Sequence, residues 1–590
     1  MKQFFKFTFA SALGFLLTFI VIILILFGVI SASLSFAEKK TVLVSDNSVL
    51  HMKLNYPIND RGVNDFNFAS FSSLMDESMG LIDILENIEK AKQDDNIKGI
   101  FVDLRDIQAG LSTIQEIRDA LADFKESGKF IVSYSEFYSQ TGYYLASVSD
   151  SVILHPEGDM MFKGINAEIM FFKDMLDKLD VEAQIIRHGK FKSAVEPFMM
   201  DHMSEANKKQ TRTYVQSIWD KLVGDIARDR NLEMAEINNI ADKLLIQSAD
   251  DAKELGFADL LLYEDEVMEL LKERSGREDE EKPELVKLTS YKDAIVEELR
   301  ETVPKNKIAV VFAEGSIQTE KGSELTISSD VTAKHLRKAR NDTTIKAIVF
   351  RVNSPGGSAL ASDVIWRETV LAAKEKPFIV SMGDLAASGG YYISAGADAI
   401  LANPTTLTGS IGVFGMIPNM EGLLTDKIGL DFDNVKTNDN AGFVSVNRSL
   451  TDYEREVLQK GVERTYEVFT SRVAEGRDMT MEEVDEIGQG RVWSGVDAKR
   501  IGLIDEFGGL NDAMAKAAEM AEIEKDDYRV MRIPEKKDPV EAIMDELTGR
   551  SSSAKMKSEL GPFYSYYEYL KELSEMQGTQ ARLPYQITIK

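Results

Sequence analysis

The sequence predicts an α/β protein built from two copies of one folding unit. The first copy contains IKGIFVDLRD (97–106) and, further on, KFIVSYSEFYSQTGYYLASVSDSVILHPEG (129–158). The second repeats both blocks in the same order, as IKAIVFRVNS (345–354) and PFIVSMGDLAASGGYYISAGADAILANPTT (377–406). Matched positions lie about 248 residues apart in both blocks. A match of this length and order indicates an internal duplication.

Short apolar runs and longer helical stretches alternate within each copy. GIFVDL, FIVSY and SVILH in the first copy, like AIVFRV, FIVSM and AILAN in the second, have the length and β-branched content of strands. Residues 113–125 and 361–374 lie between these runs and have apolar residues at helical spacing. Because strands that alternate with helices form parallel sheets, each copy is expected to be a parallel α/β domain.

The expected domain boundaries follow from length and composition. The chain has 590 residues, which is more than one hydrophobic core accommodates. The segment REDEEKPE (277–284) is charged, poor in apolar residues and contains proline, which is typical of an exposed linker. We therefore expect an N-terminal repeat domain over 41–285 and a C-terminal repeat domain over 286–535. Residues 536–590, with the aromatic cluster FYSYYEYL (563–570), are expected to form a helical or flexible tail.

Residues 1–40 are expected to anchor the chain in a membrane. Segment 7–37 carries no charged residue and contains LLTFIVIILILFGVI. About 20 helical residues span the apolar core of a bilayer, which is roughly 30 Å thick. The alternative is a cleaved signal peptide with Ser35-Phe36-Ala37 as its cleavage pattern, but the apolar part of such peptides is only about 7–15 residues long. The flanking charges mildly favour an N-terminus inside the cytoplasm and a body outside it.

The composition argues against several classes of function. A net charge of −28 disfavours a nucleic-acid partner, because binding to phosphates needs clustered Lys and Arg. The absence of cysteine excludes disulfides, thiolate metal sites and cysteine nucleophiles. The sequence has no GxxxxGK[ST] or HExxH motif, and its histidines never stand four residues apart. No metal and no cofactor are therefore expected.

Two glycine-dense segments in the second copy are candidates for chemistry. NSPGGS (353–358) follows a strand, so the backbone amides of its glycines could approach a substrate oxygen, as in an oxyanion hole. The alternative is a turn that only needs a positive φ. DLAASGGYY (384–392) follows the strand FIVSM and surrounds Ser388 with small residues, which leaves its hydroxyl reachable. A serine in this position is more commonly a helix N-cap, and the segment lacks the first glycine of a GxSxG elbow.

Comparison of the copies favours the functional interpretation of Ser388. The duplication aligns Gln140 with Ser388, and residues 107–109 replace the Pro-Gly-Gly turn. Equal structural needs would have given equal residues, so the difference indicates a function in the second copy. The first copy contributes HGKFKSAVEPF (188–198), where apolar neighbours and nearby cations would both favour the neutral amine of Lys192. The alternative for Lys192 is an ordinary surface lysine.

The sequence resembles signal peptide peptidase A (protease IV) in its long, tandem-repeat form, from the N-terminal segment to about residue 525. The motifs that carry this resemblance are KSAVEPF (192–198), NSPGGS (353–358), MGDLAASGGYY (382–392) and NPTTLTGSIGVFG (403–415). The resemblance implies two tandem domains, each a spiral of ββα units related to the crotonases and to the Clp protease subunit.

The same resemblance implies the roles of individual residues. Ser388 would be the nucleophile, Lys192 its general base, and Ser410 the serine that hydrogen-bonds this lysine. Backbone amides of Gly357 (or Gly356) and Gly389 would bind the oxyanion. The extra cation in His188-Gly189-Lys190-Phe191, ahead of the lysine, departs from the family pattern without affecting its role.

The resemblance also implies a setting. A homotetramer shaped like a bowl would sit on the periplasmic side of the bacterial inner membrane and degrade released signal peptides and other small apolar peptides. One alternative is a crotonase-like acyl-CoA enzyme, which would need an acidic catalytic residue and a basic CoA-binding surface, and which leaves the anchor unexplained. The other alternative is a catalytically silent membrane scaffold, in which the serine and lysine motifs should have eroded.

Overall fold

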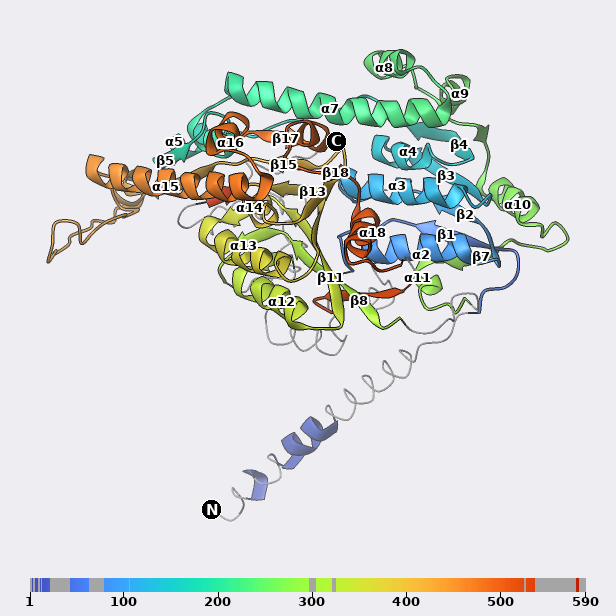
Figure 1. Cartoon of the computed structure of the whole chain (residues 1–590), viewed down its shortest axis with the longest axis horizontal. Coiled ribbons are helices and arrows are strands. Elements are labelled where there is room, and N and C mark those ends of the chain that lie inside the picture. The colour runs from blue at the N-terminus through green and yellow to red at the C-terminus, as the bar shows by residue number, and fades with distance from the viewer. Residues whose placement is uncertain are drawn as a thin grey trace.

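The computed structural model describes residues 43–62, 79–105, 107–296, 304–320, 325–524, 527–535 and 580–582, together with residues 3, 6–8, 11 and 13–21. Within these residues the chain forms three β-sheets, and helices cover them (Figure 1). Two of the sheets each belong to one repeat, and the third takes strands from both.

The first repeat forms a parallel sheet with the strand order β6-β4-β3-β2-β1-β7. Its strands are β1 (Ser48–Lys53), β2 (Ile97–Asp103), β3 (Phe130–Tyr138), β4 (Ser151–Met160), β6 (Leu260–Leu261) and β7 (Glu284–Lys287). Its helices are α2 (Leu81–Gln93), α3 (Leu111–Lys125), α4 (Gln140–Ala146), α5 (Lys173–Lys178), α6 (Glu196–Met199), α7 (Glu205–Arg230), α8 (Met234–Lys243), α9 (Ala249–Glu254), α10 (Glu264–Ser275) and α11 (Leu288–Tyr291).

The second repeat forms a sheet whose main path is β17-β15-β13-β11-β8-β19, with β14 beside β13 and β18 beside β14. Its strands are β8 (Asn306–Glu314), β11 (Ile345–Ser354), β13 (Phe378–Ala387), β14 (Ala399–Ala402), β15 (Leu407–Gly409), β17 (Val492–Ser494), β18 (Glu506–Phe507) and β19 (Tyr528–Ile533). Its helices are α12 (Ser329–Asn341), α13 (Ala359–Ala373), α14 (Gly389–Ser394), α15 (Asp452–Arg477), α16 (Met481–Ile487), α17 (Gly495–Arg500) and α18 (Leu510–Met520), with a π-helical turn at Leu423–Ile428.

The two sheets confirm the internal duplication. The order β6-β4-β3-β2-β1-β7 in the first repeat corresponds strand for strand to β18-β14-β13-β11-β8-β19 in the second. The long helices α7 and α15 correspond as well, and each has 26 residues. The prediction of two parallel α/β units is therefore confirmed, apart from β17, which pairs antiparallel with β15 at one edge of the second sheet.

The third sheet joins the repeats through strands from both. Its order is β10-β9-β12-β20-β16-β5, with β5 (Glu182–His188), β9 (Ser316–Gln318), β10 (Thr326–Ser328), β12 (Gly356–Ser358), β16 (Val413–Asn419) and β20 (Gln580–Arg582). Strand β5 comes from the first repeat and pairs antiparallel with β16, so that His188 lies opposite Val413. This pairing brings the residues that follow His188 into the second repeat.

The predicted linker, C-terminal tail and membrane span can be compared with the observed elements. The predicted linker 277–284 ends in β7, which pairs with β1, and α11 continues the first repeat to Tyr291. Of the expected tail 536–590, residues 580–582 form β20, whereas the aromatic cluster 563–570 lies outside the described residues. Most of the expected membrane span 7–37 also lies outside them. In the described part of the chain, no helix combines the length and apolar character needed to cross a bilayer.

The repeats share a hydrophobic core. One cluster of buried side chains contains Ile114 and Ile117 of α3 together with Val310 of β8, Val349 of β11 and Leu510 of α18. The opposite face of the second sheet packs in a separate cluster against its own helices. The contact between the repeats therefore has the character of a domain interior and fixes their relative position.

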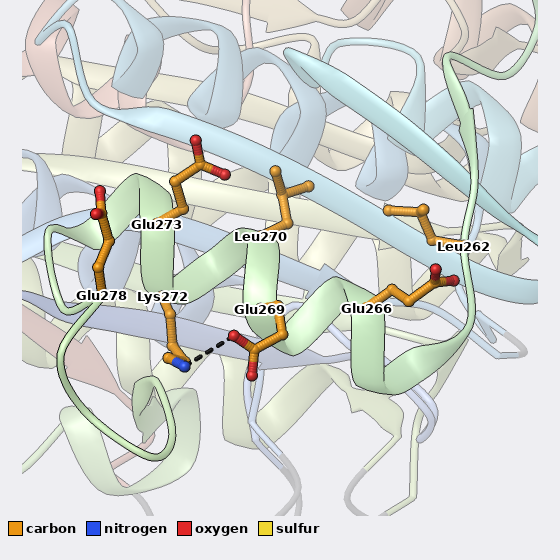
Figure 2. A pocket seen from close by; sticks show the side chains of 7 residues that line it. All are labelled: Leu262, Glu266, Glu269, Leu270, Lys272, Glu273 and Glu278. Carbon is orange, nitrogen blue, oxygen red and sulfur yellow. Dashed lines mark hydrogen bonds and ion pairs between the residues drawn. The ribbon is translucent and has the colours of Figure 1, made fainter.

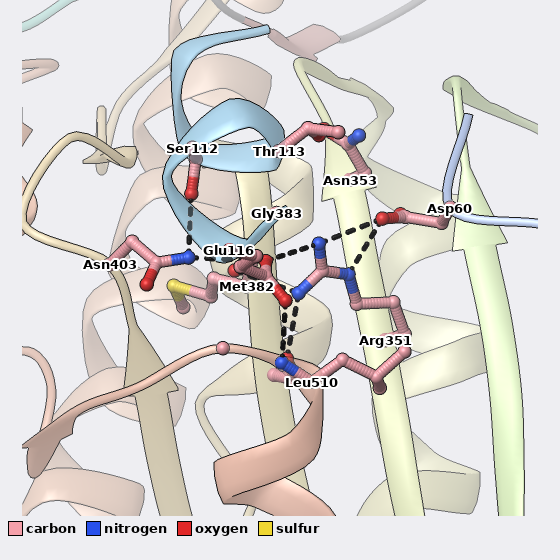
Figure 3. Close-up of polar contacts among 12 residues, drawn as sticks. Asp60, Ser112, Thr113, Glu116, Arg351, Asn353, Met382, Gly383, Asn403 and Leu510 are labelled. Carbon is pink, nitrogen blue, oxygen red and sulfur yellow. Dashed lines mark hydrogen bonds and ion pairs between the residues drawn. The ribbon is translucent and has the colours of Figure 1, made fainter. Parts of the chain in front are cut away.

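A buried cluster of charges lies in this contact (Figure 3). Arg351 of β11 is fully buried, and its guanidinium lies 2.8 Å from both Asp60 and Glu116 of the first repeat. The second carboxylate oxygen of Glu116 accepts a hydrogen bond of 2.7 Å from the amide of Leu510. Asn403 donates a further hydrogen bond of 3.1 Å to Glu116. The cluster thus connects β11, α18 and a loop of the second repeat to the first.

A second polar contact aligns α3 with the strand that leads to Ser388. The carboxylate of Asp384 accepts hydrogen bonds from the amides of Ser112 and Thr113, at 2.7 and 3.1 Å, and from the Thr113 hydroxyl at 2.7 Å. The free amides at the start of a helix favour a negative charge at this position. Asp384 therefore holds the first turn of α3 beside β13, near the end where Ser388 follows.

We expect Arg351→Met to destabilise the protein strongly, because it leaves Asp60 and Glu116 buried without their cation. Removal of one partner from a buried ion pair costs about 3–5 kcal/mol. The midpoint of thermal unfolding, followed by circular dichroism, measures the effect. The control is Arg337→Met, which removes the partly exposed ion pair with Glu368 and should cost no more than about 1 kcal/mol. Equal midpoints for the two variants would contradict a structural role for the cluster.

Candidate active site

Ser388 lies where β13 ends and α14 begins. Its side chain is fully buried, and its backbone has φ 56° and ψ −113°, a conformation that non-glycine residues avoid. Such strain costs of the order of 1–3 kcal/mol and is typical of functional sites. The amide of Ser388 donates a 2.8 Å hydrogen bond to the carbonyl of Gly409 at the end of β15. This bond to the strand end holds the backbone of Ser388 in place.

Lys192 reaches Ser388 from the first repeat. After β5 the chain turns at residues 189–191, and Lys192 precedes the 3₁₀ turn Ser193–Val195. The Lys192 Nζ lies 2.8 Å from the Ser388 Oγ, 3.1 Å from the Ser410 Oγ and 3.2 Å from the Ser410 carbonyl oxygen. The structure therefore brings together three predicted side chains that are far apart in sequence.

The backbone around Lys192 is held by the second repeat at Gln489 and Gly490. The amide of Phe191 donates a 3.0 Å hydrogen bond to the Gln489 carbonyl. Gly490 has φ 82°, and a Cβ atom at this position would lie only 2.6 Å from the Lys192 Cα. Any side chain at position 490 would displace the lysine, so this close approach requires glycine.

Gln210 of α7 completes the support of the lysine loop. Its side-chain amide nitrogen donates to the Phe191 carbonyl at 3.2 Å and to the Ser193 hydroxyl at 2.8 Å. Its amide oxygen accepts a 3.1 Å hydrogen bond from the Val492 backbone on β17. Gln210 is itself buried, so these bonds are protected from water. Helix α7 therefore clamps the loop of the first repeat to a strand of the second.

Burial lowers the pKa of Lys192 well below its ordinary value. The polar atoms around its Nζ are hydroxyl and carbonyl oxygens rather than carboxylates. Desolvation disfavours the ammonium form, and none of these contacts supplies a negative charge to offset it. A neutral amine 2.8 Å from a hydroxyl can accept that hydroxyl's proton, which is the arrangement of a base and a nucleophile.

The glycine turn lies beside Ser388. Gly356 has φ 97°, and a Cβ at this position would lie 2.7 Å from the amide nitrogen of Gly389. A Cβ on Gly389 would in turn lie 3.1 Å from the amide nitrogen of Gly357. The amide of Gly356 already donates a 3.1 Å hydrogen bond to the Ser354 hydroxyl. Of the three predicted oxyanion donors, Gly357 and Gly389 therefore have their amides close together next to Ser388.

The sequence interpretation missed the residues that support this site. Gln210 and Gly490 contact the lysine loop but lie outside the segments that the sequence indicates as reactive. Asp384 lies within the segment 384–392 that contains Ser388, but the sequence does not indicate its contact with α3. The sequence feature that could have indicated a close contact at Gly490 is the pair of glycines in GQGRVWS (488–494). No sequence pattern indicates that Gln210, in the second turn of the 26-residue helix α7, faces the lysine loop.

A hollow elsewhere on the surface has no such chemistry. It has a volume of about 490 Å³ and lies along α10, far from the site in Figure 1. Figure 2 shows its lining residues Leu262, Glu266, Glu269, Leu270, Lys272, Glu273 and Glu278. Lys272 pairs with Glu269 at 2.8 Å, and the lining contains no serine, threonine or histidine. Among the described residues, no group of three or more potential ligands could hold a metal ion.

Comparison with known families and proteins identifies relatives that match most of the chain. The model of peptidase family S49 matches residues 123–278 and again residues 371–524, once in each repeat. Protease 4 of Salmonella typhi is 37% identical over 491 residues, covering 82% of this chain and 78% of that protein. Protease 4 of Haemophilus influenzae is 35% identical over 521 residues, covering 86% of this chain and 84% of that protein.

Among solved structures, a mutant of ClpP1 from Listeria monocytogenes aligns with 35% of this chain and 94% of its own. The sequence identity is 18% and the TM-score 0.24, so the alignment adds nothing to what the sheets already establish.

We expect the reactivity of Ser388 to fall on the acid side of the lowered pKa of Lys192. Above that pKa the amine is neutral and accepts the serine proton, and as the pH falls through it the amine is protonated and the base is lost. The rate at which a serine-directed fluorophosphonate labels Ser388, measured by mass spectrometry at each pH, follows this loss of reactivity. Lys192→Ala should abolish labelling at every pH. A rate in the wild-type protein that stays constant between about pH 5 and about pH 9 would contradict a lysine base.

Proposed function

Because the chain belongs to peptidase family S49 and is a serine peptidase, we propose that Ser388 and Lys192 form its catalytic dyad. The observation that carries this proposal is the 2.8 Å contact between the Ser388 Oγ and the Lys192 Nζ, both of them buried. Family membership also favours a peptidase over the acyl-CoA enzyme and the silent scaffold that the sequence left open.

In the first half of the proposed reaction, Ser388 attacks the carbonyl carbon of the substrate while Lys192 accepts the hydroxyl proton. The amides of Gly357 and Gly389 stabilise the oxyanion that forms, because fixed donors are most effective where negative charge develops. Ser410 positions the lysine through its hydroxyl and its carbonyl oxygen, at 3.1 and 3.2 Å. The protonated Lys192 then gives its proton to the leaving amine, and an acyl-enzyme remains.

In the second half, water hydrolyses the acyl-enzyme with Lys192 again as the base. The pocket suits this cycle, because burial keeps the amine neutral at rest and the three oxygen atoms around its Nζ solvate the transient ammonium. The proposed reaction uses these side chains, the two backbone amides and water.

The proposed substrates are released signal peptides and other small apolar peptides. We further propose that residues 1–40 anchor the protein in the bacterial inner membrane, with the peptidase domains on the periplasmic side. The support for the anchor is the uncharged apolar segment 7–37. An anchored enzyme would meet hydrophobic peptides where they leave the membrane.

We also propose a homotetramer in which each chain holds a complete dyad. Support for self-association comes from the segment that runs from the end of the π-helical turn to α15. It exposes apolar side chains, including Ile428, Leu430, Phe432 and Val435, the last of them completely. Exposed apolar patches of this kind mark surfaces that bind other proteins.

Ser388→Ala and Lys192→Ala should each abolish hydrolysis of an apolar fluorogenic peptide without unfolding the protein. Because the two residues act as one unit, the double variant should be no slower than either single variant. The matched controls are Ser394→Ala, another buried serine on α14, and Lys190→Ala, an exposed lysine two residues before the base. Both controls should keep activity. More than about a tenth of the wild-type rate in either dyad variant would exclude the assignment.

A further inference from the structure

The turn of residues 488–491, between α16 and β17, supports two parts of the site at once. The carbonyl of Gln489 accepts a 3.0 Å hydrogen bond from the amide of Phe191, and the carbonyl of Arg491 accepts one of 2.7 Å from the amide of Ser410. Gln489 has φ 52°, a conformation that is costly for a residue other than glycine. Such strain persists only where the surrounding structure holds it, so the turn needs support of its own.

Tyr466 of α15 provides this support. Its hydroxyl oxygen accepts a 3.1 Å hydrogen bond from the amide of Gln489, and the hydroxyl donates one of 2.6 Å to the carboxylate of Asp485. The side chain of Gln489 donates to the same carboxylate at 3.1 Å. The Tyr466 ring stacks on His188, the last residue of β5, with ring centroids 4.0 Å apart. Burial raises the pKa of Tyr466, so the hydroxyl keeps its proton at neutral pH. One side chain therefore contacts both the turn and the strand that leads to the lysine.

The first repeat has the corresponding helix contact without this support. Helices α7 and α15 begin at residues 205 and 452, so matched positions lie 247 residues apart. At this spacing Trp219 corresponds to Tyr466 and Asn238 to Asp485. The Trp219 indole donates a 2.7 Å hydrogen bond to Asn238, which joins α7 to α8 as Tyr466 joins α15 to α16. An indole N–H cannot accept a hydrogen bond from a backbone amide. The second bond of Tyr466 is therefore additional to what the packing of the helices needs.

We propose that Tyr466 is a positioning residue of the active site: by holding the turn 488–491, it keeps Lys192 against Ser388 and away from water. This inference rests on the proposed dyad and extends it by a residue that touches neither the substrate nor the reacting atoms. The turn acts on the lysine directly, because Gly490 packs against the Lys192 Cα and Gln489 holds the preceding amide.

The effect of Tyr466 on the base follows from the burial of Lys192. Burial is what lowers the pKa of this lysine, so a displaced turn that admits water would raise the pKa towards its ordinary value. The charged groups beside the loop are Lys190 and Arg491, which lie 5.2 and 5.1 Å from the centre of the Phe191 ring, and Asp485 beyond Tyr466. None of them contacts the Lys192 Nζ, whose partners are the oxygen atoms of two serines.

The test is the pH dependence of Tyr466→Phe, which keeps the ring and its stacking but loses the hydroxyl. Its rate of hydrolysis of an apolar fluorogenic peptide should begin to fall, on the acid side, at a pH at least about one unit higher than in the wild-type protein. Well below that pH the variant should be about tenfold slower, whereas at about pH 9, where the amine is neutral in both proteins, the rates should agree within about threefold. KM should change little, because no contact with the substrate is lost. Labelling of Ser388 by a fluorophosphonate should give the same profile.

Three further variants, each shown by circular dichroism to be folded, complete the test. Trp219→Phe removes the corresponding hydrogen bond in the first repeat, and His188→Phe keeps a ring against Tyr466 but removes the imidazole; both should keep the wild-type profile. Asp485→Ala removes the carboxylate that orients the Tyr466 hydroxyl and should shift the fall in rate in the same direction as Tyr466→Phe, so it also serves if that variant does not fold.

The outcomes separate this inference from the proposed function. An unshifted profile in Tyr466→Phe, or an equal loss of rate at every pH, would overturn the inference and leave the peptidase function intact. A shifted profile in Trp219→Phe or His188→Phe would assign the effect to general loosening or to the imidazole, and would overturn it as well. Absence of hydrolysis by the wild-type protein at every pH would instead refute the proposed function.

Discussion

The site depends on burying an amine without giving it a counter-ion. A lysine is a useful base near neutral pH only if its ammonium form is destabilised, and desolvation is the means available here. Neither repeat can bury Lys192 alone, because the side chain leaves the first repeat and lies among Ser388, Ser410 and Gly490 of the second. Closure of the two repeats on each other is therefore a chemical requirement as well as a structural one.

Several independent contacts maintain that closure. Pairing of β5 with β16 fixes the direction from which the lysine loop arrives, and Gln210 joins the loop to β17. The shared apolar core holds the two repeats together. The cluster around Arg351 fixes how they are aligned, because its hydrogen bonds to Asp60 and Glu116 form in one geometry only. Asp384 links the first turn of α3 to the strand that ends at Ser388. An error in docking would thus change the position of Lys192 relative to Ser388.

The sequence was sufficient for the fold class because the duplication repeats both the strand pattern and its spacing. It also singled out Ser388 and Lys192, which the structure places 2.8 Å apart, and their roles in catalysis belong to the proposed function. In the first repeat, Gln140 stands at the position that corresponds to Ser388. Its side chain accepts hydrogen bonds from the amides of Lys163 and Gly164, so this position has a structural role there. The supporting residues could not be predicted, because Gln210 and Gly490 matter only through tertiary contacts. Strand β20 was equally hidden, since three residues in a polar tail carry no periodic signal.

The central claim is that one chain supplies both members of the dyad. Mixing folded Lys192→Ala protein with folded Ser388→Ala protein, under conditions that allow subunits to exchange, tests it most directly. If the lysine and the serine of each site belong to the same chain, every site in the mixture carries one defect, and hydrolysis of an apolar peptide stays at the background of the separate variants. Substantial recovery of activity would show that neighbouring chains share the site, and would contradict the account.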